Sequence, residues 1–224
     1  MRRSFQLLCL LISWGCLAIA QSPTPTSSES LATVTFTLDF PNSQPEHYSI
    51  RMQSDGAARY ESSGRVSPDS DEADNFAFDF TVSQAMRQKT FDLAAKAGYF
   101  QRDLDSHRKG LAFTGKKTLA YKDAQRAGES TYNYSFNASA EELTDLMQRL
   151  AATLEFGRRL DYDRHYQKLA LDQELKRMEE MAHGNQLAEI TAIQPILDQI
   201  VADSAVVNVT RARAQRLLQS AGTH

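Results

Sequence analysis

The chain has almost no cysteine. Cys9 and Cys16 are the only two among its 224 residues, and both stand within the first twenty. Without that segment the protein can form no disulfide and has no thiol nucleophile or thiolate metal ligand. A chain of this length buries roughly 70% of its unfolded surface on folding. We therefore expect a fold that its core stabilises without covalent cross-links.

Long apolar runs are missing as well. The run from Leu7 to Leu17 is shorter than the about 20 residues that a membrane-spanning helix requires. It follows Arg2 and Arg3 and precedes the small-x-small sequence that ends at Ala20. This order is typical of a secretory signal peptide. We predict a signal peptide over residues 1–20, cleavage after Ala20, export to the periplasm or the medium, and no transmembrane segment after cleavage.

Lipidation at Cys16 is the alternative fate of this segment. A lipobox has leucine three residues before its cysteine and a small residue at the next position, where this chain has Ser13 and Trp14. The pattern therefore favours cleavage after Ala20 over acylation of Cys16.

Charge of one sign is not in large excess. The chain carries 25 basic and 28 acidic residues, a net charge of −3, and loss of Arg2 and Arg3 would leave 23 − 28 = −5. Such a balance gives no reason to expect a nucleic-acid partner.

The first half of the remaining sequence has the pattern of strands. Residues 21–32 are rich in Pro, Ser and Thr and predict a disordered leader. Apolar and polar residues then alternate, Asp55-Gly56 suits a tight hairpin turn, and Ser83 and Gly98 are placed to begin and end a helix. The predicted elements are strands at 34–40 and 76–82, a hairpin over 47–62, a polar loop over 63–75, a helix over 83–97, and strands near 111–122 and 129–137.

The second half is helical in pattern. Ser139-Ala140-Glu141-Glu142 fits a capping box and opens a helix. From Arg158 onward we expect one helix to about Ala182, a second over 186–201 in which Pro195 marks a kink or a restart, and a third over 204–219. Strands first and helices later predict an α+β fold. Residues 33–157 would form an antiparallel sheet of about six strands with two packed helices, and residues 158–224 a helical C-terminal region.

One set of residues resembles a known pattern. Pro45-Glu46-His47-Tyr48-Ser49-Ile50, Asp55-Gly56 and Tyr60, followed by a phenylalanine-rich strand and a helix, resemble uncharacterised bacterial exported proteins that share a P-x-x-Y-S-I…D-G…Y hairpin. Some of those proteins also show T-G-x-K-T-L, which Thr114-Gly115-Lys116-Lys117-Thr118-Leu119 resembles. The likeness covers about residues 34–160. It implies export from a bacterium, and it assigns no activity and no functional residue.

Two motifs suggest chemistry that their context does not support. Gly110 to Thr118 nearly matches the phosphate-binding pattern G-x-x-x-x-G-K-[ST], but Lys117 replaces the hydroxyl residue and strand-like sequence follows. A bent strand with solvent-facing lysines is the favoured interpretation. Residues 69–74 gather four acids that could hold Ca²⁺ but lack the EF-hand spacing. We interpret them as a solvated acidic loop and leave cation binding open.

No other group of residues has the spacing of a catalytic, metal or cofactor site, and we predict none of these sites. Asp161 and His165 stand four residues apart on a predicted helix, which favours a surface ion pair.

Charge is distributed unevenly along the chain. Residues 61–79 carry a net charge of −5 and residues 108–126 a net charge of +5. If these segments are adjacent in the fold they neutralise each other, and if they lie apart the basic one is a candidate face for an acidic partner. Basic residues late in the last helix also complement its dipole. The candidate interaction residues are Lys109, Lys116, Lys117, Lys122, Arg126, Arg211, Arg213 and Arg216.

These observations predict an exported, non-catalytic binding or envelope-associated module whose partner is an unknown protein or envelope component. One alternative is a hydrolase whose acids, such as Asp69, Asp71 and Asp161, meet only in three dimensions. Another is an interaction protein that associates through its C-terminal helices. A pocket that converges on two or more acids with shifted pKa values would favour the enzyme. An exposed apolar stripe along residues 158–220 would favour association.

Overall fold

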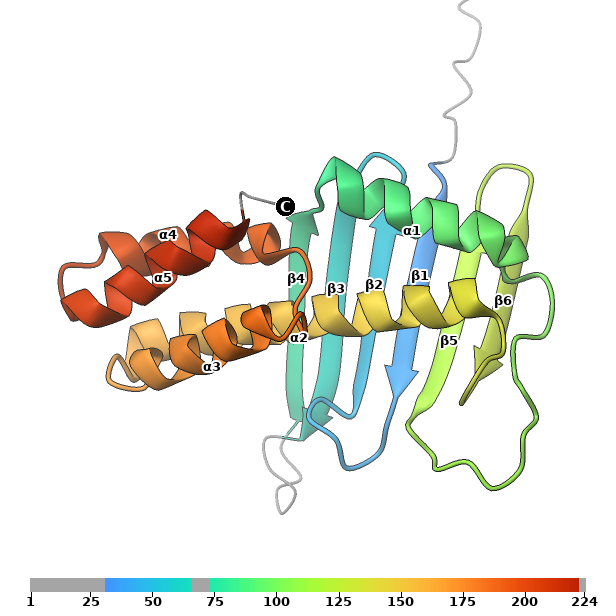
Figure 1. Cartoon of the computed structure of the whole chain (residues 1–224), viewed down its shortest axis with the longest axis horizontal. Helices are drawn as coiled ribbons and strands as arrows, with labels where there is room; N and C mark the ends of the chain where they lie inside the picture. Colours follow the sequence, from blue (N-terminus) through green and yellow to red (C-terminus); the bar gives the residue numbers. More distant parts are fainter. Residues whose placement is uncertain (1–30, 66–72, 222–224) are drawn as a thin grey trace, which may run out of the picture.

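The computed structural model describes residues 31–65 and 73–221, which adopt an α+β fold (Figure 1). Six strands form one antiparallel sheet in the order β4-β3-β2-β1-β5-β6. The strands are β1 (Thr33–Asp39), β2 (His47–Gln53), β3 (Ala57–Arg65), β4 (Ala73–Thr81), β5 (Lys116–Lys122) and β6 (Ala127–Tyr132). The fold class predicted from the sequence is confirmed.

The alternating pattern of the strands sets which face of the sheet is buried. In the centre, Phe36 of β1 pairs with Ile50 of β2 and Leu119 of β5, and all three side chains are fully buried. Because successive side chains point to opposite faces, Thr35 and Thr37 lie on the other side. β2 and β3 form the predicted hairpin, with Gly56 in its turn at a φ of 99°.

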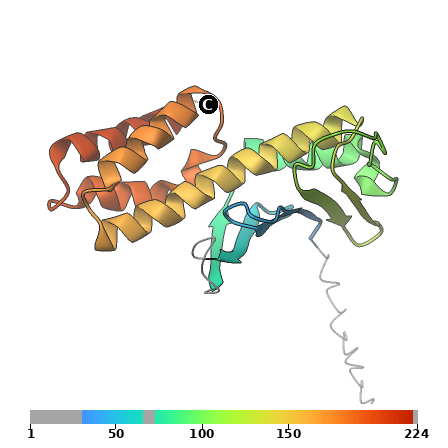
Figure 2. The same cartoon turned by 90° about the horizontal axis from the view of Figure 1, so that it is seen from below.

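Two helices cover the apolar face of the sheet (Figure 2). The first, α1 (Gln84–Lys96), begins after Ser83, whose side chain accepts the Met86 N–H, and Gly98 follows it with a φ of 70°. The second, α2 (Ala138–Tyr166), crosses the sheet and continues beyond β4 (Figure 1). No described helix covers the opposite face of the sheet, which bears the polar side chains of the strands.

The predicted capping box at the start of α2 is wrong. The cap is Asn137, whose side-chain oxygen accepts the N–H groups of Ser139 and Ala140, each at 3.1 Å. The carboxylate of Glu141 accepts the Ser135 N–H at 2.7 Å. Asparagine and serine are comparable caps, so the sequence contains two possible starts that lie two residues apart.

The remaining helices pack against the part of α2 that extends past the sheet. Residues 158–221 are called the helical extension below. It contains, besides the end of α2, the elements α3 (Leu171–His183), η2 (Ile190–Ile193), α4 (Gln194–Ala202) and α5 (Asn208–Ala221). The predicted boundary at 157/158 falls inside α2, so one continuous helix joins the sheet to the extension.

Helix bounds within the extension differ from those predicted. The single helix expected to reach Ala182 is broken at residues 167–170, and residues 186–189 are not helical. The third helix begins at Asn208 rather than near residue 204. The apolar period continues across the first break because Leu160 and Leu171, on either side of it, both enter the same core. Pro195 is the second residue of α4, where its missing N–H removes no helical hydrogen bond, so it marks a restart of the helix rather than a kink.

Strand bounds also differ. β5 begins at Lys116 rather than near residue 111, and β6 ends at Tyr132, leaving Phe136 67% exposed. Gly110 and Gly115, with φ of 79° and 98°, turn the backbone before β5. β3 and β4 extend into the predicted polar loop. The predicted signal peptide, nearly all of the leader and residues 69–72 of the acidic loop lie outside the described residues.

Candidate functional site

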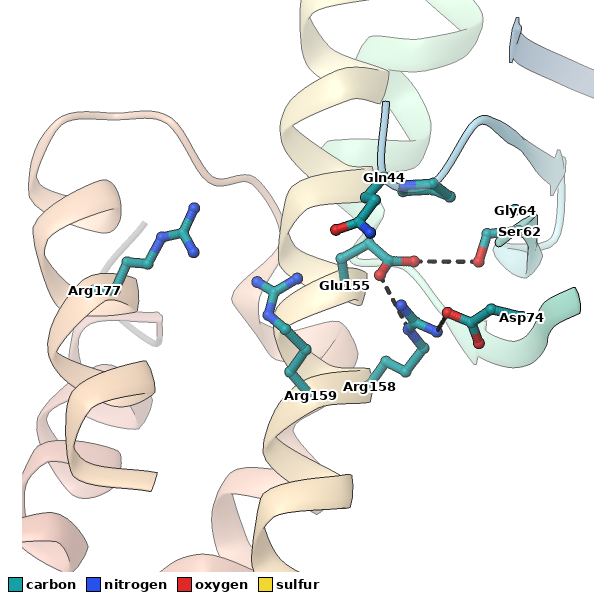
Figure 3. Close-up of a pocket in the computed structure, with 9 residues that line it drawn as sticks. Gln44, Ser62, Gly64, Asp74, Glu155, Arg158, Arg159 and Arg177 are labelled. Atoms are coloured by element: carbon teal, nitrogen blue, oxygen red, sulfur yellow. Dashed lines mark hydrogen bonds and ion pairs between the residues drawn. The ribbon is translucent and has the colours of Figure 1, made fainter. Parts of the chain in front are cut away.

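A cleft of about 280 Å³ lies where the edge of the sheet meets the helical extension, and it is called the junction cleft below. Residues from the β1–β2 loop, β3, β4, α2 and α3 line it (Figure 3). They are Gln44, Pro45, Ser62, Gly64, Asp74, Glu155, Arg158, Arg159 and Arg177. A Cβ atom on Gly64 would lie 3.2 Å from the Glu46 backbone nitrogen, so this glycine lets the β1–β2 loop approach β3 closely.

The carboxylate of Glu155, a residue that is 7% exposed, lines the cleft. One of its oxygens accepts hydrogen bonds from the Tyr60 hydroxyl at 2.8 Å and the Ser62 hydroxyl at 3.2 Å. The other accepts the Nε–H of Arg158 at 3.0 Å. A buried carboxylate without such partners is costly, and here both of its oxygens are engaged. Burial, and then the charge of Glu155, raise the pKa of Tyr60.

Arg158 connects α2 to the edge strand. Its Nη1 donates to the Asp74 carboxylate of β4 at 2.7 Å, while its Nε donates to Glu155 within α2. Burial acts to lower the pKa of Arg158, but the hydrogen bonds and charges of Asp74 and Glu155 outweigh it and raise the pKa. The three groups therefore form one ionic network between the sheet and α2.

Two further guanidinium groups lie beside this network. Arg159 pairs with Glu174 of α3, and its guanidinium carbon lies 4.6 Å from the ring centroid of Phe156. The guanidinium carbon of Arg177 lies 6.0 Å from the same ring. Among the described residues no carboxylate forms an ion pair with Arg177. In Figure 3, Arg177 extends from α3 toward α2, and the Arg159 guanidinium lies between it and the pair of Glu155 and Arg158.

A second, wider hollow of about 550 Å³ lies beside η1 (Gly98–Phe100). Its two aspartates, Asp103 and Asp105, accept backbone N–H groups of the neighbouring loop. The Asp103 carboxylate accepts the Asp105 N–H at 2.9 Å, and the Asp105 carboxylate accepts the N–H groups of His107 at 2.6 Å and Asn133 at 3.1 Å. This hollow draws on fewer separate segments than the junction cleft does and contains no buried carboxylate.

The two lysines of the phosphate-loop-like segment have different surroundings, and the prediction that both face solvent is wrong for one. Lys117 is 6% exposed. Its Nζ donates to the Thr114 hydroxyl at 2.8 Å and the Asn133 carbonyl at 2.7 Å, and burial lowers its pKa. Lys116 is exposed and pairs with Asp39 at 3.3 Å. The alternation of β5 explains the difference, because neighbouring residues of a strand face opposite sides.

The described parts of the acidic and basic segments do not meet. Residues 61–65 and 73–79 lie on β3 and β4, whereas residues 108–126 lie in and around β5, with β2 and β1 between them. Part of the basic segment is paired locally, since Arg126 binds Asp123 at 2.8 Å and stacks on Tyr99. Lys109 and Lys122 are exposed.

The basic residues of the last helix hold α5 against α3. Arg213 donates to Asp172 at 2.8 Å and to Glu179 at 2.7 Å, and Arg216 also binds Glu179. Arg211 donates to Asn208 at the start of α5. These arginines and the basic residues of β5 are therefore not gathered into one cationic face.

The predicted pair of Asp161 and His165 lies on the surface of α2. The His165 ring approaches the Asp161 carboxylate at 3.6 Å, and Arg164 also binds that carboxylate at 3.2 Å. Asp69 and Asp71 lie outside the described residues. Within the described part of the chain, no group of three or more His, Cys, Asp or Glu side chains could hold a metal ion.

The end of the helical extension carries exposed apolar side chains. Leu169, between α2 and α3, is 94% exposed, and Tyr166 is 74% exposed. Val207, before α5, is 59% exposed, and the ion pair of Lys168 with Asp203 at 2.7 Å joins these two loops. Association through the helices would depend on this tip. Among the described residues, no helix is long and apolar enough to cross a membrane.

No sequence pattern predicted the charged residues of the junction cleft except Asp74, which belongs to the predicted acidic loop. One signal for Glu155 was present. Met147 and Ala151 lie on the apolar stripe of α2, and a further step of four residues reaches Glu155, so a charge stands where the pattern requires an apolar residue. Arg159 and Arg177 have no such signal, because charged residues on a helix surface are ordinary.

No protein-family model matches the chain, and a search of curated proteins found no match. The residues of the junction cleft are therefore the basis for a functional proposal.

Proposed function

We propose that the chain is an exported, non-catalytic binding module whose ligand occupies the junction cleft. The proposal rests on which charged groups of the cleft already have partners within the protein. The carboxylates of Glu155 and Asp74 are engaged by donors of the protein itself, whereas Arg177 has no carboxylate partner among the described residues. An acid–base catalyst needs a group that can exchange a proton with its substrate. A binding site needs donors that remain available to a ligand, which is the arrangement here.

The position of the cleft supports the same function. Ligand sites occur preferentially between structural units, where residues from several elements converge on a small volume. A ligand in the junction cleft would touch the sheet through Ser62 and Asp74 and the helical extension through Arg159 and Arg177. The buried network of Glu155 holds these elements in fixed positions before the ligand arrives.

Nuclear magnetic resonance of the isotope-labelled protein tests the proposal. Small polar solutes, anionic, neutral and cationic, are added one at a time. We expect at least one of them to shift the amide signals of Ser62, Gly64 and Asp74 and to be recovered unchanged. The proposal fails if every solute that binds shifts signals only outside the cleft, or if a bound solute is converted to product.

Two variants separate a binding role from a folding role. Arg158→Gln removes the bridge between Glu155 and Asp74 and should lower the free energy of unfolding by about 1–3 kcal/mol, since it breaks a partly buried ion-pair network. Arg177→Gln removes an exposed guanidinium that has no carboxylate partner within residues 31–65 and 73–221, and should change that free energy by less than about 0.5 kcal/mol. Weaker binding at unchanged stability in Arg177→Gln would support the cleft as the ligand site.

Export is part of the proposal and is supported by the pattern of residues 1–20. Mass spectrometry of the protein recovered outside the cytoplasmic membrane should give a chain that begins at Gln21. A chain that retains Met1, or one with a lipid on Cys16, would contradict this part. The partner expected there is an unknown protein or envelope component, and the cleft is where its bound group would lie.

A further inference from the structure

We infer that the ligand of the junction cleft is a small hydroxylated solute carrying an oxyanion, a carboxylate or phosphate, which Arg159 and Arg177 bind together. This inference rests on the proposed function of the cleft. It adds the chemical class of the ligand and the residues that select it.

The two guanidinium groups both lie near the ring of Phe156. Their carbons lie 4.6 Å and 6.0 Å from the ring centroid of Phe156, a side chain that is 1% exposed. Two positive charges on neighbouring helices therefore lie beside one buried ring and line the same cleft. Like charges repel each other. Glu174 pairs with Arg159 alone, so an additional anion would relieve the repulsion from Arg177.

The donors that remain suit an oxyanion. Arg159 uses its Nε–H on Glu174, which fixes the plane of the guanidinium and leaves its terminal N–H groups for a ligand. Guanidinium groups present N–H donors in a rigid fork that matches the oxygens of carboxylates and phosphates. Gln44 from the β1–β2 loop lines the same cleft and can donate from its amide.

The remainder of the cleft indicates what else the ligand carries. A volume of about 280 Å³ is close to the lower end of small-molecule pockets, and it exceeds what a single inorganic anion fills. Ser62 and Asp74 line the side away from Arg177 and offer hydroxyl and carboxylate oxygens. Hydroxyl groups of a ligand would donate to Asp74. The best fit is therefore a compact polar solute with an anionic group at one end and hydroxyls at the other.

Four probes that share a hexose ring test this inference on the whole protein. Glucuronate and glucose 6-phosphate carry an oxyanion, glucose is neutral, and glucosamine is cationic. Calorimetric titration gives the dissociation constants, and amide shifts locate the binding. We expect the two anionic probes to bind at Ser62, Gly64 and Asp74 at least tenfold more tightly than glucose. Added sodium chloride should weaken the binding of the anionic probes.

Variants assign the selectivity to the arginines. Arg177→Gln should weaken binding of the anionic probes roughly tenfold or more, because a charge-assisted hydrogen bond is lost. Arg177→Lys should recover part of that loss, since it keeps the charge without the fork. Arg51→Gln removes an exposed positive charge from β2 at a residue that does not line the cleft, and should leave the dissociation constants unchanged.

The outcomes distinguish this inference from the proposed function. If glucose or glucosamine binds the cleft as tightly as the anionic probes, the ligand class is wrong and the binding function stands. If the anionic probes bind the cleft but Arg177→Gln binds them equally well, the assignment to Arg177 is wrong. If no probe, and none of the wider set of solutes used for the proposed function, shifts the cleft signals, the binding function itself fails.

Discussion

The carboxylate of Glu189 caps the start of α1 from the helical extension. One oxygen accepts the Ser83 backbone N–H at 2.7 Å, and the other accepts the Ser83 hydroxyl at 2.8 Å. The same hydroxyl accepts the Met86 N–H at 3.1 Å, so it is both the helix cap and a donor to Glu189. Glu189 has a φ of 54° in the turn before η2. A side-chain contact thus links the sheet domain to the extension at a point remote in sequence from the α2 connection.

Removing either partner of this contact should destabilise the protein. Glu189→Ala should lower the free energy of unfolding by about 1 kcal/mol, the usual net value of a lost hydrogen-bond partner. Ser83→Ala should cost a similar amount or more, because the helix also loses its cap. Since both changes remove the same interaction, the double variant should lose less than the sum of the two. Urea unfolding measures all three, and strictly additive losses would show that the two residues are not coupled.

Gly157 is the point where α2 crosses η2. A Cβ atom there would lie 2.6 Å from Cγ2 of Ile193, whose side chain is fully buried. Gly157→Ala should therefore lower the free energy of unfolding by about 1–3 kcal/mol through overpacking. This loss should appear even though alanine is favoured over glycine inside a helix by up to about 1 kcal/mol.

Two further variants test the packing argument for Gly157. Ile193→Ala removes the Cγ2 atom that would clash. In the Ile193→Ala variant, Gly157→Ala should therefore lower the free energy of unfolding by less than it does in the wild type. Gly184→Ala is the matched control, because an added Cβ there meets its nearest neighbours at 3.5–3.6 Å, an ordinary contact, at a φ of −78°. Thermal unfolding should show a lower Tm for Gly157→Ala alone. An unchanged or higher Tm would mean that Ile193 moves aside without cost.

The strands and the two packed helices could be predicted from sequence because their signals are local. Phe36 and Leu38 alternate with threonines, and Gly56 lies in a turn that needs positive φ. Ser83 caps a helix by accepting the N–H of Met86, three residues later. Each of these depends on neighbours within a few positions. The wrong prediction of the cap at the start of α2 also has a local cause. Asn137 and Ser139 are both good caps, and the sequence alone does not choose between them.

The candidate site could not be predicted because its residues are far apart in the chain. Glu155 meets Tyr60 across 95 positions, and Arg158 meets Asp74 across 84. Neither pair leaves a spacing motif. Arg177 differs from Arg158 in having no carboxylate partner among the described residues. This can be recognised only when the positions of its neighbours are known. The break before α3 was missed for a related reason, since helices that share one core keep one apolar period.

Stability should fall at alkaline pH because the fold raises the pKa of four tyrosines. Burial is the first cause in each case, raising the pKa of Tyr121 to about 12 and those of Tyr48, Tyr60 and Tyr132 as well. A raised pKa favours the neutral phenol in the folded state. The stabilisation is complete below the unfolded pKa of about 10 and is lost as the pH rises above it. Urea unfolding at pH 9, 10 and 11 should therefore show a progressive decrease in the free energy of unfolding.

Tyr60→Phe tests this pH dependence. It removes one of the four phenols, so the loss of stability between pH 9 and pH 11 should be smaller than in the wild type. At neutral pH the variant should already be less stable by about 1–2 kcal/mol, because Glu155 loses a buried donor. Tyr166→Phe, at a position that is 74% exposed, controls for the substitution itself. If wild type and Tyr60→Phe lose the same stability between pH 9 and pH 11, Tyr60 does not contribute to the pH dependence.

At the opposite end of the pH range, Asp123 stabilises the β5–β6 turn. The Gln125 N–H donates to its carboxylate at 2.7 Å, and the Arg126 N–H and the Tyr121 hydroxyl donate as well. Together they lower the pKa of Asp123 to about 2 against the opposing effect of burial. A depressed pKa means that the stabilisation is present above the unfolded pKa of about 3.8 and is lost as the pH falls toward 2.

Asp123→Asn keeps an acceptor oxygen but removes the charge. The variant should be less stable than the wild type at pH 6, because Tyr121 and Arg126 then donate to a neutral group. The difference should shrink between pH 4 and pH 2, where the wild-type carboxylate itself becomes protonated. Other acids titrate in the same range but do so in both proteins, so the comparison isolates Asp123. A difference in unfolding free energy that stays constant from pH 6 to pH 2 would show that hydrogen-bond geometry, rather than charge, holds the turn.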